Sequence, residues 1–147
     1  MELTKEYKFE ASHVLPKHPG RCSRLHGHSW VLRVSVEGRV NKETGFVMDY
    51  ADISKVVKPL IESLDHRHLG TWGHILTDVA ELEDRHAHDN WMVEGLPFDF
   101  YPTSENLLVW IGFELAEDLH WSKLELLETC TSSAVLTREE FERTVPV

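Results

Sequence analysis

The amino-acid sequence predicts an α+β fold in which helices pack on an antiparallel sheet. Strand-type patterns come in pairs, one pair near each end of the chain, and two helix-type patterns lie between the pairs. Strands that alternated singly with helices would instead indicate a parallel sheet. The 147 residues are the length of one ordinary domain, so we predict a single domain over residues 1–147.

The N-terminal pair of strands is predicted from apolar residues at every second position. The first strand is expected over residues 2–9, where Leu3, Tyr7 and Phe9 share one face. The second strand is predicted more clearly, because large apolar residues occupy every second position; they are Trp30, Leu32, Val34 and Val36. Residues 41–45 are expected to form a turn, and residues 46–48 could extend a hairpin.

Two helices are predicted from apolar residues at helical spacing. The first begins near Asp49 or Tyr50, and Pro59 should kink it or divide it in two. Its buried stripe is Ile53, Val56, Val57, Leu60, Ile61 and Leu64. The second begins after Pro102, with Thr103 or Ser104 as N-cap, and its stripe is Leu107, Leu108, Ile111, Leu115 and Leu119. Strands over 123–129 and 134–137 and a short helix over 138–143 complete the prediction.

Charge and cysteine content narrow the class of function. The formal net charge of −10 argues against nucleic acid or an anionic membrane surface as the main partner. No apolar run approaches the length of a membrane span, and the N-terminus does not resemble a secretory signal. Cys22 and Cys130 are too few for a disulfide framework. We therefore expect a cytoplasmic protein with free thiols.

The strongest chemical signal is a group of histidines in a chain that is rich in them, with ten in total. His26 and His28 are two apart on a predicted strand, so both can point at one ion. His13 is the nearest third ligand, and three imidazoles leave a fourth position on zinc for water or substrate. Cys22 could fill that position instead, which would make a closed structural site. Spacing alone leaves a metal site and ordinary surface histidines about equally weighted.

Two further features have both a chemical and a structural interpretation. Asp65 precedes His66 just after the first predicted helix, where a carboxylate could orient an imidazole; taken alone, the pair is better explained as a polar helix end. Glu128 shares strand parity with Leu124 and Leu126, which places it on a face that is otherwise apolar. A flat heterocycle with adjacent N–H groups would satisfy such a carboxylate, but the strand could also end there in solvent.

Six short motifs occur in one order along the chain and cover residues 3–69 and 101–131 well. They are Phe9-x-Ala11-Ser12-His13, Cys22-x-x-x-His26-Gly27-His28, Gly45-Phe46-Val47-Met48-Asp49-Tyr50, Leu64-Asp65-His66, Pro102-Thr103-Ser104-Glu105-Asn106 and Glu128-Thr129. Together they resemble the 6-pyruvoyl-tetrahydropterin synthase and 6-carboxy-tetrahydropterin synthase superfamily. The resemblance implies a tunnelling fold (T-fold), a four-stranded antiparallel sheet with two helices on one face. It also implies a homo-oligomer, trimers or hexamers, in which the sheets form a barrel and the active sites lie at subunit interfaces.

The resemblance further implies a site and a reaction. Zinc would be held by His13, His26 and His28; Cys22 would be the catalytic base, activated by His66, which Asp65 orients. Substrate would be held by Glu128, which would anchor the pterin ring, and by Thr103, Ser104 and Glu105, which would help shape the pocket. The implied reaction converts 7,8-dihydroneopterin triphosphate to 6-carboxy-5,6,7,8-tetrahydropterin, releasing triphosphate and acetaldehyde, towards queuosine-type 7-deazapurines.

Alternatives remain open at this level. Three residues separate Cys22 from His26, as in the carboxy-forming enzymes; the pyruvoyl enzymes typically have a longer gap, and an aldolase-type cleavage is a third outcome. A non-catalytic metal-binding module would explain the histidines but not Cys22, Asp65-His66 and Glu128 together. Gly70 stands where the family commonly has Asn.

The link from Asp65 to Pro102 is longer than in the family. We interpret this extended insertion, at about residues 70–100, as a lid or an added interface element with apolar residues to dock. A second metal site at His86 and His88 is a weaker alternative. The apolar residues of the insertion are Trp72, Trp91, Phe98 and Phe100, and its remaining histidine is His74.

Overall fold

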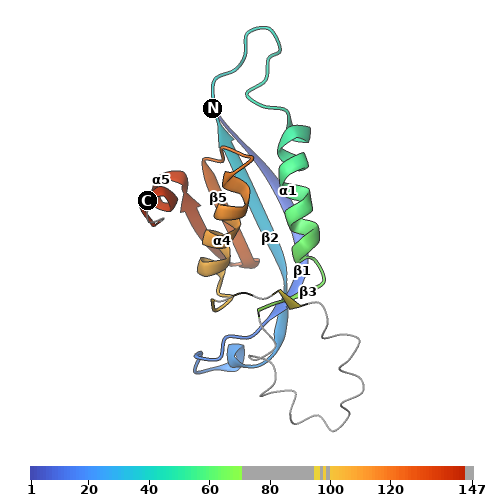
Figure 1. Ribbon diagram of the computed structural model, residues 1–147, viewed down its shortest axis with the longest axis vertical. Helices are drawn as coiled ribbons and strands as arrows, with labels where there is room; N and C mark the ends of the chain where they lie inside the picture. The colour runs from blue at the N-terminus through green and yellow to red at the C-terminus, as the bar shows by residue number, and fades with distance from the viewer. Residues whose placement is uncertain (71–94, 97, 99, 145–147) are drawn as a thin grey trace.

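A mixed sheet is the centre of the molecule (Figure 1). The computed structural model describes residues 1–70, 95–96, 98 and 100–144. Within them the sheet has six strands in the order β4-β3-β1-β2-β5-β6. The strands are β1 (Glu2–His13), β2 (His26–Glu37), β3 (Arg67–Leu69), β4 (Gly95–Leu96), β5 (Lys123–Thr129) and β6 (Ser132–Thr137). The four predicted strands pair antiparallel, which confirms the α+β class, and the short β3 and β4 add in parallel beside β1.

The helices begin where side-chain caps are available. Helix α1 (Tyr50–Leu64) begins after Asp49, whose Oδ1 accepts the backbone N–H of Ala51 at 2.8 Å. It is not divided at Pro59, which lies on the exposed side, where water can satisfy the carbonyl freed one turn earlier. Helix α4 (Ser104–Ala116) begins after Thr103, whose Oγ1 accepts the N–H of Asn106 at 3.2 Å. The chain also forms a turn of 3₁₀ helix, η1 (Arg21–Ser23), and the short α5 (Arg138–Thr144).

One face of the sheet forms the core. The register places Phe9 beside Trp30 and Leu32 beside Leu126, so the apolar side chains of three strands lie on the same face. Helices α1 and α4 contribute to the same buried cluster, as the sequence predicted for two helices on one face. Tyr7 anchors α1 through a contact of 3.0 Å between its hydroxyl and that of Ser54.

The other face of the sheet is polar. Arg33 in the middle of β2 donates to Glu6 of β1 at 2.9 Å and to Glu125 of β5 at 3.1 Å. Because these side chains are partly exposed, the ion pairs add little to stability. They do show which face of the sheet points away from the core, because a shift of one residue in strand register would move every side chain to the opposite face.

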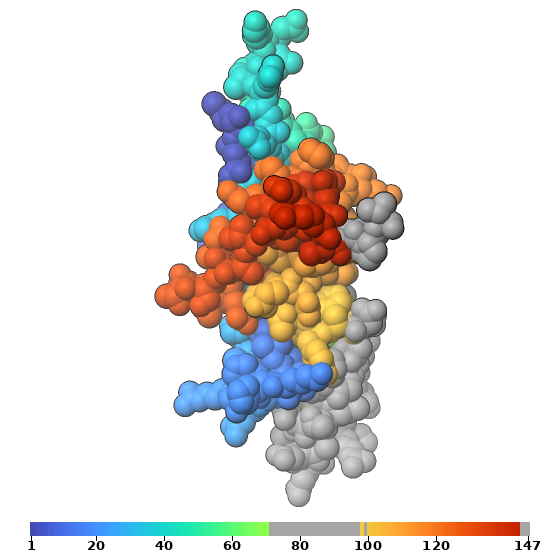
Figure 2. All heavy atoms as spheres, turned by 90° about the vertical axis from the view of Figure 1, so that its left-hand side faces the viewer, coloured from blue at the N-terminus to red at the C-terminus, as the bar shows by residue number. Residues whose placement is uncertain are grey.

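The connection between β2 and α1 forms an arm. Residues 38–49 project beyond the end of the sheet (Figures 1 and 2), with Val40 and Phe46 largely exposed. No strand forms over residues 46–48, so the predicted hairpin extension is wrong; the Asn41 side chain instead accepts two backbone N–H groups in a turn. None of the helices in the described part of the chain is long and apolar enough to span a membrane.

A candidate metal centre beside a candidate active site

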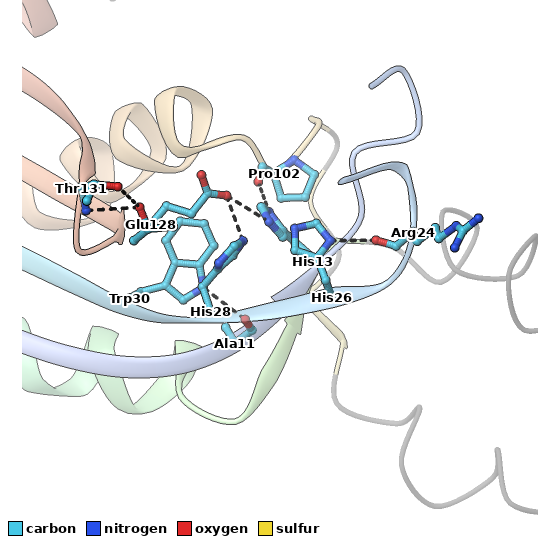
Figure 3. A network of polar contacts seen from close by, with 10 residues as sticks. Ala11, His13, Arg24, His26, His28, Trp30, Pro102, Glu128 and Thr131 are labelled. Carbon is cyan, nitrogen blue, oxygen red and sulfur yellow. Dashed lines mark hydrogen bonds and ion pairs between the residues drawn. The ribbon is translucent and has the colours of Figure 1, made fainter. Parts of the chain in front are cut away.

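Three histidines meet at one end of the core face of the sheet (Figure 3). Strand β1 extends four residues beyond its predicted end, and β2 begins earlier than its clear alternation, so His13 pairs with His26 across the two strands. His28 lies two residues further on the same face of β2. The ring centroids are 4.5, 5.1 and 4.9 Å apart for the pairs His13–His26, His13–His28 and His26–His28. The structure therefore brings together the three predicted metal ligands.

Backbone carbonyls orient two of these rings. Nδ1 of His13 donates to the carbonyl oxygen of Pro102 at 2.7 Å, and Nδ1 of His26 donates to that of Arg24 at 2.7 Å (Figure 3). A carbonyl can only accept, so in the neutral ring the Nε2 atom carries the lone pair. The Nε2 atoms of all three histidines are buried and make no hydrogen bond. Rings held in this way through the other nitrogen are typical of metal ligands.

Burial favours the neutral form of His13 and His28. Desolvation lowers the pKa of His13 from 6.5 to about 4, and the neighbouring histidines lower it further, against the hydrogen bond to Pro102, which raises it. Desolvation also lowers the pKa of His28, although the charge of Glu128 opposes the shift. Imidazole binds a metal in its neutral form, so these pKa shifts favour metal binding at neutral pH.

Glu128 contacts two of the histidines, which was not predicted from the sequence. Its Oε1 lies 3.2 Å from Nε2 of His13 and 3.1 Å from Nε2 of His28. The four potential ligand atoms, one from each histidine and one from Glu128, all lie within 4.8 Å of one another. Cys22 does not belong to this group, so the structure does not favour it as the fourth ligand of a closed site. The available signal was strand parity, which placed Glu128 on the core face.

Trp30 forms the base of the cluster and was missed as a site residue. Its ring meets those of His13 and His28 edge to face, with centroids 5.1 and 5.3 Å apart. Its Nε1 donates to the carbonyl oxygen of Ala11 at 3.1 Å, and the side chain is fully buried. Its position two residues after His28, at the same parity, was the signal that could have identified it.

Asp65 contacts His66, and among the described residues no hydrogen bond or ion pair links these two side chains to the histidine cluster. Asp65 accepts the backbone N–H of Glu10 at 2.8 Å through Oδ1 and contacts Nδ1 of His66 at 3.0 Å through Oδ2. These bonds, the one from Glu10 first, lower the pKa of Asp65. His66 has a positive φ of 57° and a side chain that is 79% exposed. His66 lines one pocket together with His28, Ser12 and Ser29.

The other predicted site residues lie in η1 and at the start of α4. Cys22 lies half-buried in η1, and among the described residues no hydrogen bond or ion pair joins its thiol to His66. Thr103 is the N-cap of α4, while Ser104 and Glu105 form its first turn. Because Pro102 holds His13, the motif at residues 102–106 has a structural role in addition to any contact with substrate.

Only the end of the long link can be described. His74, His86 and His88 lie outside the described residues, and so do Trp72 and Trp91. Phe98 is buried in the core cluster and stacks on Phe100, with ring centroids 4.6 Å apart. Phe98 also meets Trp110 of α4 at 4.9 Å. The link therefore rejoins the domain through aromatic packing on α4. Gly70, at the other end, has a φ of 133°, a conformation that favours glycine over the usual Asn.

Comparisons with known proteins agree with this geometry. The sequence profile of 6-pyruvoyl tetrahydropterin synthase matches residues 2–139. The chain is 38% identical over 141 residues to 6-carboxy-5,6,7,8-tetrahydropterin synthase of Synechocystis sp., covering 90% of this chain and 89% of the relative. It is 32% identical over 120 residues to dihydroneopterin monophosphate aldolase of Pyrococcus furiosus, covering 77% and 91%. The 6-pyruvoyl tetrahydropterin synthase structure of Caenorhabditis elegans superposes with a TM-score of 0.68 at 19% identity, covering 93% and 94%.

Proposed function

Because the chain belongs to the 6-pyruvoyl tetrahydropterin synthase family, we propose that it is a zinc-dependent 6-carboxy-5,6,7,8-tetrahydropterin synthase. Its substrate would be 7,8-dihydroneopterin triphosphate, and its products the carboxypterin, acetaldehyde and triphosphate, on the route to queuosine-type 7-deazapurines. The observation that carries the proposal is the convergence of three histidines and Glu128 at one end of the sheet. The name of the Synechocystis relative supports the carboxy product, and so does the short spacing from Cys22 to His26.

The residues present fit a divalent metal. Three buried Nε2 atoms without hydrogen bonds face one another, two of them fixed by backbone carbonyls. Imidazole nitrogens suit zinc, and the family is metal-dependent in general. When bound, zinc would supply Lewis acidity towards the oxygens of the substrate side chain.

The chain's own groups would move the protons and hold the ring. We assign the role of base to Cys22, whose thiol is half-buried and unpaired. His66 would exchange protons through Nε2 while Asp65 holds Nδ1. Glu128 would accept the amino and ring N–H groups of the pterin, and Thr103, Ser104 and Glu105 would help shape the pocket around the ring.

We further propose that the working form is a homo-oligomer with the site at a subunit interface. The His66 side chain is largely exposed, and no hydrogen bond or ion pair within the described part of the chain joins it to the histidine cluster, so Asp65 and His66 of one copy would serve the cluster of another. The exposed apolar side chains of the arm would then be covered, chiefly Phe46 and Val40. We place the protein in the cytoplasm, which accords with its two unpaired cysteines.

Product analysis tests the proposal. Zinc-loaded protein is incubated with 7,8-dihydroneopterin triphosphate and the products are identified by mass spectrometry. Carboxytetrahydropterin with acetaldehyde is the expected result; the pyruvoyl compound or an aldolase product would move the reaction within the family. Cys22→Ser should abolish turnover while metal content stays unchanged. Metal binding without turnover of any dihydroneopterin substrate would indicate a non-catalytic metal-binding protein.

A further inference from the structure

The contacts of Glu128 are unusual for a residue whose expected partner is a substrate ring. Its Oε1 lies 3.2 Å from Nε2 of His13 and 3.1 Å from Nε2 of His28, on the inner side of both rings (Figure 3). The carboxylate therefore points at the same place as the histidine lone pairs. Its side chain keeps 25% of its surface exposed, so it is not confined to this position by packing.

The contact with His13 is repulsive unless a metal ion or a proton lies between the two atoms. Nδ1 of His13 uses its proton on the carbonyl of Pro102, and the neutral ring then presents a lone pair at Nε2. A carboxylate oxygen also presents lone pairs, and two such atoms at 3.2 Å repel each other. A metal ion removes the repulsion at both histidines at once. The competing explanation is a proton on Nε2 of either histidine or on the Glu128 carboxyl, which would make a hydrogen bond where the metal would otherwise lie.

The two distances from Glu128 are compatible with neighbouring ligands of one metal ion and also with ordinary hydrogen bonds. In a tetrahedral zinc site with ordinary zinc–nitrogen and zinc–oxygen distances, adjacent ligand atoms lie about 3.3–3.5 Å apart. The separations of 3.1 and 3.2 Å from Oε1 of Glu128 are close to that range.

The backbone at Glu128 is suited to a side chain with two positions. The register between β5 and β6 shifts between Leu127 and Thr129, which marks a bulge at Glu128. Bulges interrupt the ladder and re-aim side chains, often beside active sites. Glu128 is therefore less constrained than Leu124 and Leu126, which share its face in the regular part of the strand.

We propose that Glu128 is the fourth ligand of the metal while no substrate is bound, and that capture of the pterin ring draws it away. The second half of this inference rests on the proposed function, because it needs a pterin as substrate. Ring recognition would then open a coordination position for the substrate side chain, so the metal is shielded until the correct ring arrives. The exchange breaks the contact of Glu128 with the metal and forms hydrogen bonds from the pterin ring to Glu128, and no covalent bond changes.

The ligand assignment is tested through metal binding, with no use of turnover. Glu128→Gln is compared with Glu125→Gln, a control on the same strand whose carboxylate contacts Arg33 on the polar face. Zinc affinity is measured by chelator competition, and Co²⁺ replaces zinc for visible absorption spectra. We expect Glu128→Gln to lose about tenfold or more in affinity, at least the loss usual for supporting residues of a metal site, and to change the Co²⁺ spectrum. The control should match the wild type in both.

The movement is tested with 6-methylpterin, which has the ring but no side-chain oxygens to bind a metal. Binding of 6-methylpterin is monitored by the fluorescence of the pterin. At saturation it should change the Co²⁺ spectrum of the wild type and leave the spectrum of Glu128→Gln unchanged. Metal affinity and spectrum unaltered in Glu128→Gln would overturn the ligand assignment in favour of a hydrogen bond alone. No binding of 6-methylpterin, or binding without a spectral change in the wild type, would overturn the exchange.

These failures are distinct from failure of the proposed function. A protein that makes carboxytetrahydropterin but shows no spectral difference in Glu128→Gln refutes the inference and keeps the function. A protein inert towards dihydroneopterin triphosphate can still establish Glu128 as a ligand. Thermal unfolding of the metal-free variants separates loss of a ligand from loss of the fold.

Discussion

The metal-free protein should lose stability as the pH falls below 6.5, and His13 should account for much of the loss. His13 is fully buried, and burial lowers its pKa from 6.5 to about 4. The unfolded chain therefore takes up a proton from pH 6.5 downward, whereas the folded chain takes it up only near pH 4. Because the unfolded state binds more protons in this window, the free energy of unfolding falls with pH and levels off below about pH 4.

The size of the effect follows from the same values. A pKa that falls from 6.5 to about 4 corresponds to about 3 kcal/mol between the top and the bottom of the window. This figure is a ceiling, because the carboxylate of Glu128 lies 3.2 Å away and favours the protonated ring. In the middle of the window the slope from one proton approaches about 1.4 kcal/mol per pH unit.

Urea unfolding followed by circular dichroism measures this slope. The protein is kept in chelator at one concentration, between pH 4.5 and 7.5. His13→Asn should be less stable than the wild type at neutral pH but should depend less on pH, since it lacks the group that titrates. His120→Asn, which removes an exposed histidine of the loop after α4, is the control and should keep the wild-type slope. Equal slopes in His13→Asn and the wild type would refute the reasoning.

Three further changes test other parts of the structure. Thr103→Ala removes the side-chain cap of α4 and should lower the free energy of unfolding by about 1 kcal/mol in urea titrations, whereas Thr103→Ser should retain it. Asp65→Asn should lower kcat by about 10²- to 10⁴-fold with unchanged metal content; loss of metal would contradict a role confined to proton transfer. Gly112→Ala places a Cβ 3.1 Å from ring atoms of Phe141 and Trp121. Crowding of about 1–3 kcal/mol should exceed the gain of about 1 kcal/mol in helix propensity, so the melting temperature should fall, and a rise would show that the rings give way.

Strand parity predicted a large part of the fold and of the site. Alternation placed His26 and His28 on the face of Trp30 and Leu32, and the structure keeps them there. The N-terminus of α4 was predicted from Thr103, because capping is a local interaction between a side chain and the next turn. Such features depend on residues a few positions apart, so they can be predicted from a single sequence.

Features that depend on distant pairing were not predicted. Strands β3 and β4 span only three and two residues, too few to show a period; β3 pairs with the edge of β1, and β4 pairs with β3. The ends of β1 and β2 also moved, since pairing between His13 and His26 continues the ladder beyond the apolar pattern. The contacts of Glu128 with both histidines required β5 to lie beside β2, a fact of tertiary structure.

The backbone carbonyls that hold His13 and His26 bear on how the site tolerates mutation. A substitution at Arg24 changes the side chain but retains the carbonyl that orients His26, so Arg24→Ala should preserve metal affinity. Substitutions at these supporting positions should therefore have little effect on metal affinity. A deletion of one residue in the loop that leads to His26 would instead displace the carbonyl itself. Across evolution, this part of the protein should accept new side chains readily and changes of loop length rarely.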